Sequence, residues 1–165
     1  MTSTHAGALL RHFADLRNGT HGEIAILRED KEKLFAATVE LLDPGAHQAL
    51  TELNEDLLLG TGTIAASGLT RSPDGGMAAV WALTWKEQNI AGISPVLIRA
   101  HYGRGFHHPH LSGATVGEWP LNVFTAEQAM EELPTMRAII AADLHNLVFQ
   151  ADYRIVPATM NAVPG

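Results

Sequence analysis

Residues 72–86 read Ser72-Pro-Asp-Gly-Gly-Met-Ala-Ala-Val-Trp-Ala-Leu-Thr-Trp-Lys86, and this stretch decides the fold class. Its proline, aspartate and two glycines favour a tight turn, and the residues after the turn follow a period of two. Side chains two residues apart in an extended strand share a face. We therefore expect a β-hairpin whose Trp81 and Trp85 lie on one face and pack against helices.

Further strands extend this hairpin into a sheet. Residues 60–70 form the strand before the turn, and residues 95–103 form a third strand. The third strand alternates, with Val96, Ile98, Ala100 and Tyr102 facing one way and Leu97, Arg99 and His101 facing the other. A short strand is also expected over residues 121–124. These segments predict an antiparallel sheet of three to five strands.

Apolar residues at helical spacing mark both ends of the chain. The N-terminal helices are expected over residues 6–16, 30–42 and 46–58, with a break at Pro44-Gly45. The C-terminal helices are a short one that begins at Thr125 and ends at Pro134, and a long apolar one over residues 135–153. Helices on both sides of an antiparallel sheet predict a single α+β domain over residues 1–165, with a loose tail from about residue 156.

The composition fits one packed globule and excludes two classes of partner. Hydrophobic residues make up 46% of the 165 residues and charged residues 18%, as in ordinary folded domains. The formal net charge is −7, and lysine occurs only at positions 31, 33 and 86, so no basic cluster forms. Nucleic acids and anionic membrane surfaces both require clustered cations, and we expect neither as a partner.

The absence of cysteine excludes thiol catalysis, disulfides and thiolate zinc sites, and it fits a reducing compartment. The first residues lack the apolar run of a signal peptide. The longest apolar run, over residues 77–83, is too short to span a membrane. We therefore expect a cytoplasmic protein.

Histidine is the one residue type with an unusual distribution. Of nine histidines, four lie close together: His101, His107, His108 and His110. In extended backbone, the pair formed by His108 and His110 presents both rings on one face, and His101 on the preceding strand supplies a third nitrogen. Glu118 follows as a carboxylate ligand. Three protein ligands plus water are the layout of a catalytic zinc or iron site, so a divalent metal is the candidate cofactor.

Two other interpretations of this stretch stay open. Arg99 and Arg104, beside His107, would hold an anionic ligand. Alternatively, the histidines are ordinary surface or loop residues, and His110 satisfies backbone groups at a turn.

The middle of the chain, over residues 64–124, resembles the core of the ubiquitin-conjugating (E2) family. The matching residues are Gly75-Gly76, the tryptophan-rich strand, Ser94-Pro95-Val96-Leu-Ile, His108-Pro109-His110-Leu111 and Trp119-Pro120-Leu121. That family has a histidine–proline–asparagine motif before its catalytic cysteine. Here His110 takes the position of the asparagine and no cysteine exists, so the resemblance implies a fold kept for binding or structure.

Two classes of function follow from the sequence. The first is a non-enzymatic binding or assembly module that self-associates as a homodimer through the last helix, where Ile139 and Phe149 lie outside the main apolar stripe. The second is a metal- or anion-binding protein or a hydrolase that uses the histidine cluster at 101–110. The polar residues of the last helix, Asp143, His145 and Asp152, are interpreted as solvated.

Overall fold

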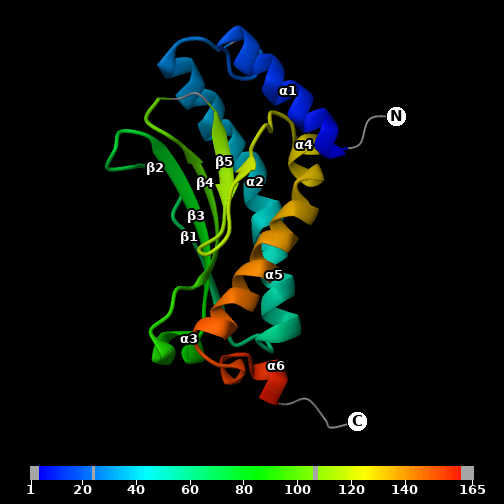
Figure 1. Cartoon of the computed structure of the whole chain (residues 1–165), viewed down its shortest axis with the longest axis vertical. Coiled ribbons are helices and arrows are strands. Elements are labelled where there is room, and N and C mark those ends of the chain that lie inside the picture. The colour runs from blue at the N-terminus through cyan, green and yellow to red at the C-terminus, as the bar shows by residue number, and fades with distance from the viewer. Residues whose placement is uncertain (1–3, 24, 106–107, 161–165) are drawn as a thin grey trace.

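Figure 1 shows the computed structural model, which describes residues 4–23, 25–105 and 108–160. The helices are α1 Thr4–Asn18, α2 Arg28–Leu57, α3 Lys86–Ala91, α4 Ala126–Glu131, α5 Leu133–Gln150 and α6 Pro157–Met160, with the 3-10 turn η1 Tyr153–Ile155. The strands are β1 Thr63–Ala66, β2 Thr70–Arg71, β3 Met77–Thr84, β4 Val96–Tyr102, β5 Pro109–Ser112 and β6 Trp119–Pro120. None of the described helices is long and apolar enough to cross a membrane.

All strand pairs are antiparallel, in the order β1-β3-β4-β5-β6, and β2 also pairs with β3. Among the described residues the sheet has six strands, of which β2 and β6 contribute two residues each. Helices precede and follow the sheet in the chain, so the predicted α+β class is confirmed. The turn over residues 72–76 also forms as expected, because the Ser72 N–H donates to the Gly76 carbonyl at 2.8 Å.

The alternation predicted along β3 and β4 sets the core face of the sheet. Val96, Ile98, Ala100 and Tyr102 are all buried, whereas their neighbours on β4 are exposed or half-buried. Both tryptophans are buried as predicted, and each finds a partner for its indole N–H. Trp81 donates to the Asp43 carboxylate on α2 at 2.8 Å, and Trp85 donates to the Ile155 carbonyl at 2.7 Å.

The prediction that Pro44-Gly45 breaks a helix is wrong, since α2 runs through both residues. Proline at this position costs about 3 kcal/mol of helix stability, because it removes one backbone hydrogen bond. The helix continues because α5 packs closely against it here. A Cβ on Gly45 would lie 2.9 Å from Cε of Met136 on α5, so glycine is needed for close contact between helices rather than for a turn.

Helix α5 packs against α2 on one side and against β4 on the other (Figure 1). Ile139 is fully buried between them, so it is wrong to place it on a free apolar patch. Phe149 in the last turn is 79% exposed. The unusually apolar composition of this helix is therefore explained mainly by burial on two sides within its own chain.

The N-terminal helix α1 forms as predicted but turns its apolar residues outward. Its exposed large side chains are Leu9, Leu10, Phe13 and Leu16. The inner face carries His12 and Asp15, both buried. The Asp15 carboxylate accepts hydrogen bonds from the Thr20 hydroxyl and from the backbone N–H groups of Gly22 and Glu23, at 2.8–3.0 Å. Polar contacts therefore hold α1 in place.

Two segments differ from the expected strands and tail. Residues 121–124 are not a strand, because side chains of two helices bind their carbonyl groups. The Thr38 hydroxyl of α2 donates to the Val123 carbonyl at 2.7 Å. The Arg11 guanidinium of α1 donates to the Asn122 carbonyl at 3.1 Å. The described part of the expected loose tail, residues 156–160, contains the buried Val156 and the helix α6. The rest of that tail, residues 161–165, lies outside the described residues.

Candidate metal centre

Strand pairing places two of the predicted ligands side by side. His101 on β4 and His110 on β5 are direct cross-strand partners, so their rings point to the same face of the sheet. This face is opposite to the core, because Ala100 and Leu111, which alternate with the two histidines, are buried. The two imidazole rings are stacked, with centroids 5.7 Å apart and an interplanar angle of 28°.

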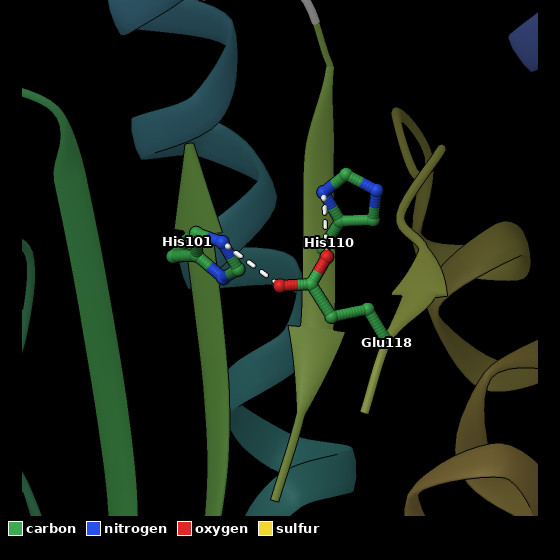
Figure 2. A group of neighbouring side chains, drawn as sticks. All are labelled: His101, His110 and Glu118. Atoms are coloured by element: carbon green, nitrogen blue, oxygen red, sulfur yellow. Dashed lines mark ion pairs between the residues drawn. The ribbon is translucent and has the colours of Figure 1, made fainter. Parts of the chain in front are cut away.

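Glu118, just before β6, completes a three-residue cluster on this face (Figure 2). One carboxylate oxygen lies 3.5 Å from Nε2 of His101, and the other lies 3.7 Å from Nδ1 of His110. One ligand atom from each of the three side chains lies within 4.8 Å of the other two. The side chains are 20%, 22% and 52% exposed in the order His101, His110 and Glu118, so the cluster is open to solvent on the carboxylate side.

These spacings suit a small divalent ion. Imidazole nitrogen and carboxylate oxygen bind Zn²⁺ at about 2.1 Å, and two ligands in a tetrahedral arrangement then lie about 3.4 Å apart. The two nitrogen–oxygen distances in the cluster are close to that value. Small side-chain rotations would therefore bring the three ligand atoms around one ion.

The lowered pKa values of His101 and His110 favour the neutral imidazole that metal binding requires. Burial lowers the pKa of His101, and the neighbouring Arg99 guanidinium lowers it further, while Glu118 acts in the opposite direction. Burial also lowers the pKa of His110, with a contribution from His108. The contacts with Glu118 are consequently not ion pairs at pH 7 and leave the ring nitrogens available as ligands.

Comparison of the chain with protein-family models, curated proteins and solved structures finds no match. The resemblance to the ubiquitin-conjugating core therefore stays a prediction.

The other predicted site residues lie around the cluster. The His108 ring is not part of the three-residue group and instead lies edge-on between the rings of His110 and His12, with centroid distances of 4.4 and 4.7 Å. Arg99 is exposed on β4 and Arg104 is exposed in the turn after it. His107 lies outside the described residues. A row of imidazoles therefore leads from the cluster to α1.

Asp143 holds the connection that carries Glu118, and its interpretation as a solvated residue is wrong. It is 0% exposed, because α5 is buried on two sides. Its carboxylate accepts hydrogen bonds from the N–H groups of Ala114 and Thr115 and from the Thr115 hydroxyl, at 2.6–2.8 Å. A longer bond of 3.3 Å comes from the Leu97 N–H. These contacts tie the start of the β5–β6 connection to β4 and α5.

The sequence also gave no indication of His12 as a neighbour of the cluster. Its helix carries apolar residues on one side and Arg11, His12 and Asp15 on the other, and the prediction of this helix rests on the apolar side alone. The sequence carries no signal for this inward orientation, because the polar side of an amphipathic helix usually faces solvent.

The second ring nitrogen of His101 is not fixed by a hydrogen bond among the described residues. Its Nδ1 is buried and has no hydrogen-bond partner among the described residues. Histidines that bind metals usually donate this second N–H to a carbonyl or carboxylate, and loss of that contact weakens metal affinity about 10–100-fold. A metal ion at this cluster would therefore be held more weakly than one whose histidine ligands have both ring nitrogens supported.

Proposed function

We propose that this protein binds one divalent transition-metal ion through His101, His110 and Glu118. The observation that carries the proposal is the convergence of three ligand atoms, from β4, β5 and the residue just before β6, within 4.8 Å of one another. Two imidazoles and one carboxylate suit zinc, nickel, copper or iron rather than calcium or magnesium.

The open side of the cluster favours a site that keeps one position free for water or substrate. Structural zinc sites are closed by four protein ligands, whereas catalytic sites use three and keep one position for water or substrate. Only three ligands converge among the described residues, and Glu118 is half exposed. A bound ion would therefore have a free position for a water molecule or an anion, and the exposed Arg99 lies on the same face two residues before His101.

The test is metal stoichiometry on untagged protein, since a histidine tag would compete for the ion. We expect isothermal titration with zinc and elemental analysis after dialysis to give one ion per chain. The variants His110→Ala and Glu118→Gln should each lose this ion. His145→Ala is the matched control, because His145 is exposed on α5 and far from the cluster in sequence.

Two outcomes separate the alternatives. A His108→Ala variant that keeps full affinity supports the three-residue centre, and one that loses it supports a centre that includes the histidine pair 108 and 110. Equal zinc binding by wild type and by a His101→Ala/His110→Ala double variant contradicts the proposal.

Self-association is the second candidate function, and exposed apolar side chains favour it. Phe149 remains exposed on α5, and α1 exposes Leu10 and Phe13. Large exposed apolar side chains on one helix are typical of an interface, and a symmetric dimer is the commonest way to cover them. Sedimentation velocity at micromolar concentration tests this. A dimer lost in Phe149→Ser places the interface on α5, and a dimer lost in Leu10→Ser/Phe13→Ser places it on α1. A monomer at every concentration contradicts both.

A further inference from the structure

A cavity of about 350 Å³ lies between the start of α1, strand β6 and the start of α5. Most of its lining is apolar, from Ala8, Leu9, Trp119, Pro120, Pro134 and Ala138. Trp119 pairs with the buried Leu111, so its side chain lies on the core face of the sheet, opposite to the histidine cluster. Small-molecule sites have this volume and this mainly apolar character, with a few polar groups that fix orientation.

One carboxylate faces this apolar cavity. Glu132, between α4 and α5, lines it and is only 6% exposed. None of the ion pairs among the described residues includes Glu132. A buried carboxylate without a paired cation is costly to keep ionised, and burial accordingly raises the pKa of Glu132.

The charged groups around Glu132 do not replace a bound cation. Arg11 on α1 influences the carboxyl through space, but its guanidinium donates to the side chain and the backbone carbonyl of Asn122, at 3.0 and 3.1 Å. His5 lines the cavity and acts in the same direction, while Glu131 acts in the opposite one. The Thr135 hydroxyl is the remaining polar contact of the carboxyl.

We propose that this cavity binds a small organic ammonium compound, with its charged nitrogen at Glu132 and its apolar body against Trp119, Leu9 and Pro134. An ammonium group supplies the direct ion pair that the buried carboxylate lacks among the described residues, and a charge-assisted hydrogen bond is about twice as strong as a neutral one. The apolar lining matches a ring or a branched chain of a few carbon atoms. Anionic compounds are disfavoured by the same carboxylate.

The test uses 2-phenylethylamine, which is protonated at neutral pH, and its neutral analogue 2-phenylethanol. Binding is followed by isothermal titration and by the NMR signal of the Trp119 indole N–H. We expect the amine to bind wild-type protein at least about tenfold more tightly than the alcohol, the difference that one charged hydrogen bond makes. In Glu132→Gln the amine should lose this advantage while the affinity for the alcohol stays the same.

Two further measurements separate binding from a structural role of Glu132. Because its pKa is raised by burial, replacing it with the neutral glutamine should leave the free energy of unfolding unchanged or increase it, whereas a purely structural carboxylate predicts a loss. Ala138→Trp narrows the cavity from its exposed rim and should weaken both ligands. Equal affinity for amine and alcohol in wild-type protein, or binding of neither, overturns the proposal.

Discussion

Two carboxylates lie at opposite ends of the connection between β5 and β6. Asp143 of α5 binds the start of this connection, and Glu118 is its last residue. The surroundings of the two side chains differ. The Asp143 carboxylate accepts hydrogen bonds from residues 114 and 115, and the Asp143 side chain is fully buried. Glu118, four residues further on from Ala114, is half exposed and faces two imidazoles. A carboxylate whose oxygens accept several hydrogen bonds from the protein stabilises the fold. A carboxylate without such hydrogen bonds is available to a ligand.

Removal of the Asp143 charge should have the largest effect on stability. Asp143→Asn turns an amide N–H toward part-buried backbone N–H groups of residues 114 and 115, so we expect a loss of about 3 kcal/mol in the free energy of unfolding. Chemical denaturation measures this. Glu118→Gln, the matched change at the other end of the connection, should alter stability by less than about 1 kcal/mol. Similar losses in both variants would remove the distinction between the two carboxylates.

In the presence of metal, Glu118 should also contribute to the stability of the folded state. An ion that binds only the folded state stabilises it by about 2.7 kcal/mol at a hundredfold excess over its Kd, and we expect this shift with zinc or nickel. Glu118→Gln should abolish it. Protonated imidazole cannot bind metal, and the pKa values of His101 and His110 are lowered from 6.5, so the shift should persist to a pH below that value and disappear at lower pH. Thermal denaturation with and without metal between pH 8 and pH 4 checks this.

The buried His21 provides a comparison with the partly exposed His101 and His110. His21 is buried against Tyr102 and Phe124, and burial lowers its pKa to about 4. The unfolded chain takes up a proton near pH 6.5, whereas folded His21 does not until about pH 4, so stability falls as the pH decreases through this window.

Between pH 7.5 and pH 5 the lowered pKa of His21 reduces the free energy of unfolding by about 2 kcal/mol. Denaturation at the two pH values should show that His21→Phe loses about that much less stability than wild type. An unchanged pH dependence in His21→Phe would mean that other groups account for the acid sensitivity.

The smallest expected effect tests the fit of the backbone around Asp143. A Cβ on Gly113 would lie 2.8 Å from the Asp143 carboxylate, so Gly113→Ala should cost about 1–2 kcal/mol. Gly103→Ala is the control, since a Cβ there meets nothing within 4 Å. Equal stability of the two variants, measured by denaturation, would show that the Asp143 loop adjusts freely.

The sheet could be predicted because local pattern alone decides it. Alternation along β3 and β4 gave the buried face, and the Ser72–Gly76 turn gave the pairing of the two strands beside it. The continuity of α2 could not be predicted, because it depends on Met136, which lies 91 residues beyond Gly45 in the chain. Proline and glycine normally end a helix, and only the approach of α5 explains their place here.

The candidate site was predictable only in part for a related reason. The spacing of the histidines suggested His108 and His110, with His101 as a third ligand, but strand pairing brings together His101 and His110 and leaves His108 outside the cluster. Glu118 was named as a ligand, but its position depends on the loop that Asp143 holds. The burial of Asp143 itself follows from packing on two sides of α5, which one helical period does not reveal.

Helix α1 has a consequence for how a ligand reaches the protein's interior. A helix gains most of its docking energy from buried apolar surface, but α1 leaves Leu10, Phe13 and Leu16 in water and relies on Arg11 and Asp15. Such a helix can detach while the sheet and the other helices stay folded. The first turns of α1 also form one wall of the cavity at Glu132. Local detachment of α1 would therefore open this cavity, and the rate of ligand entry would depend on how often this detachment occurs.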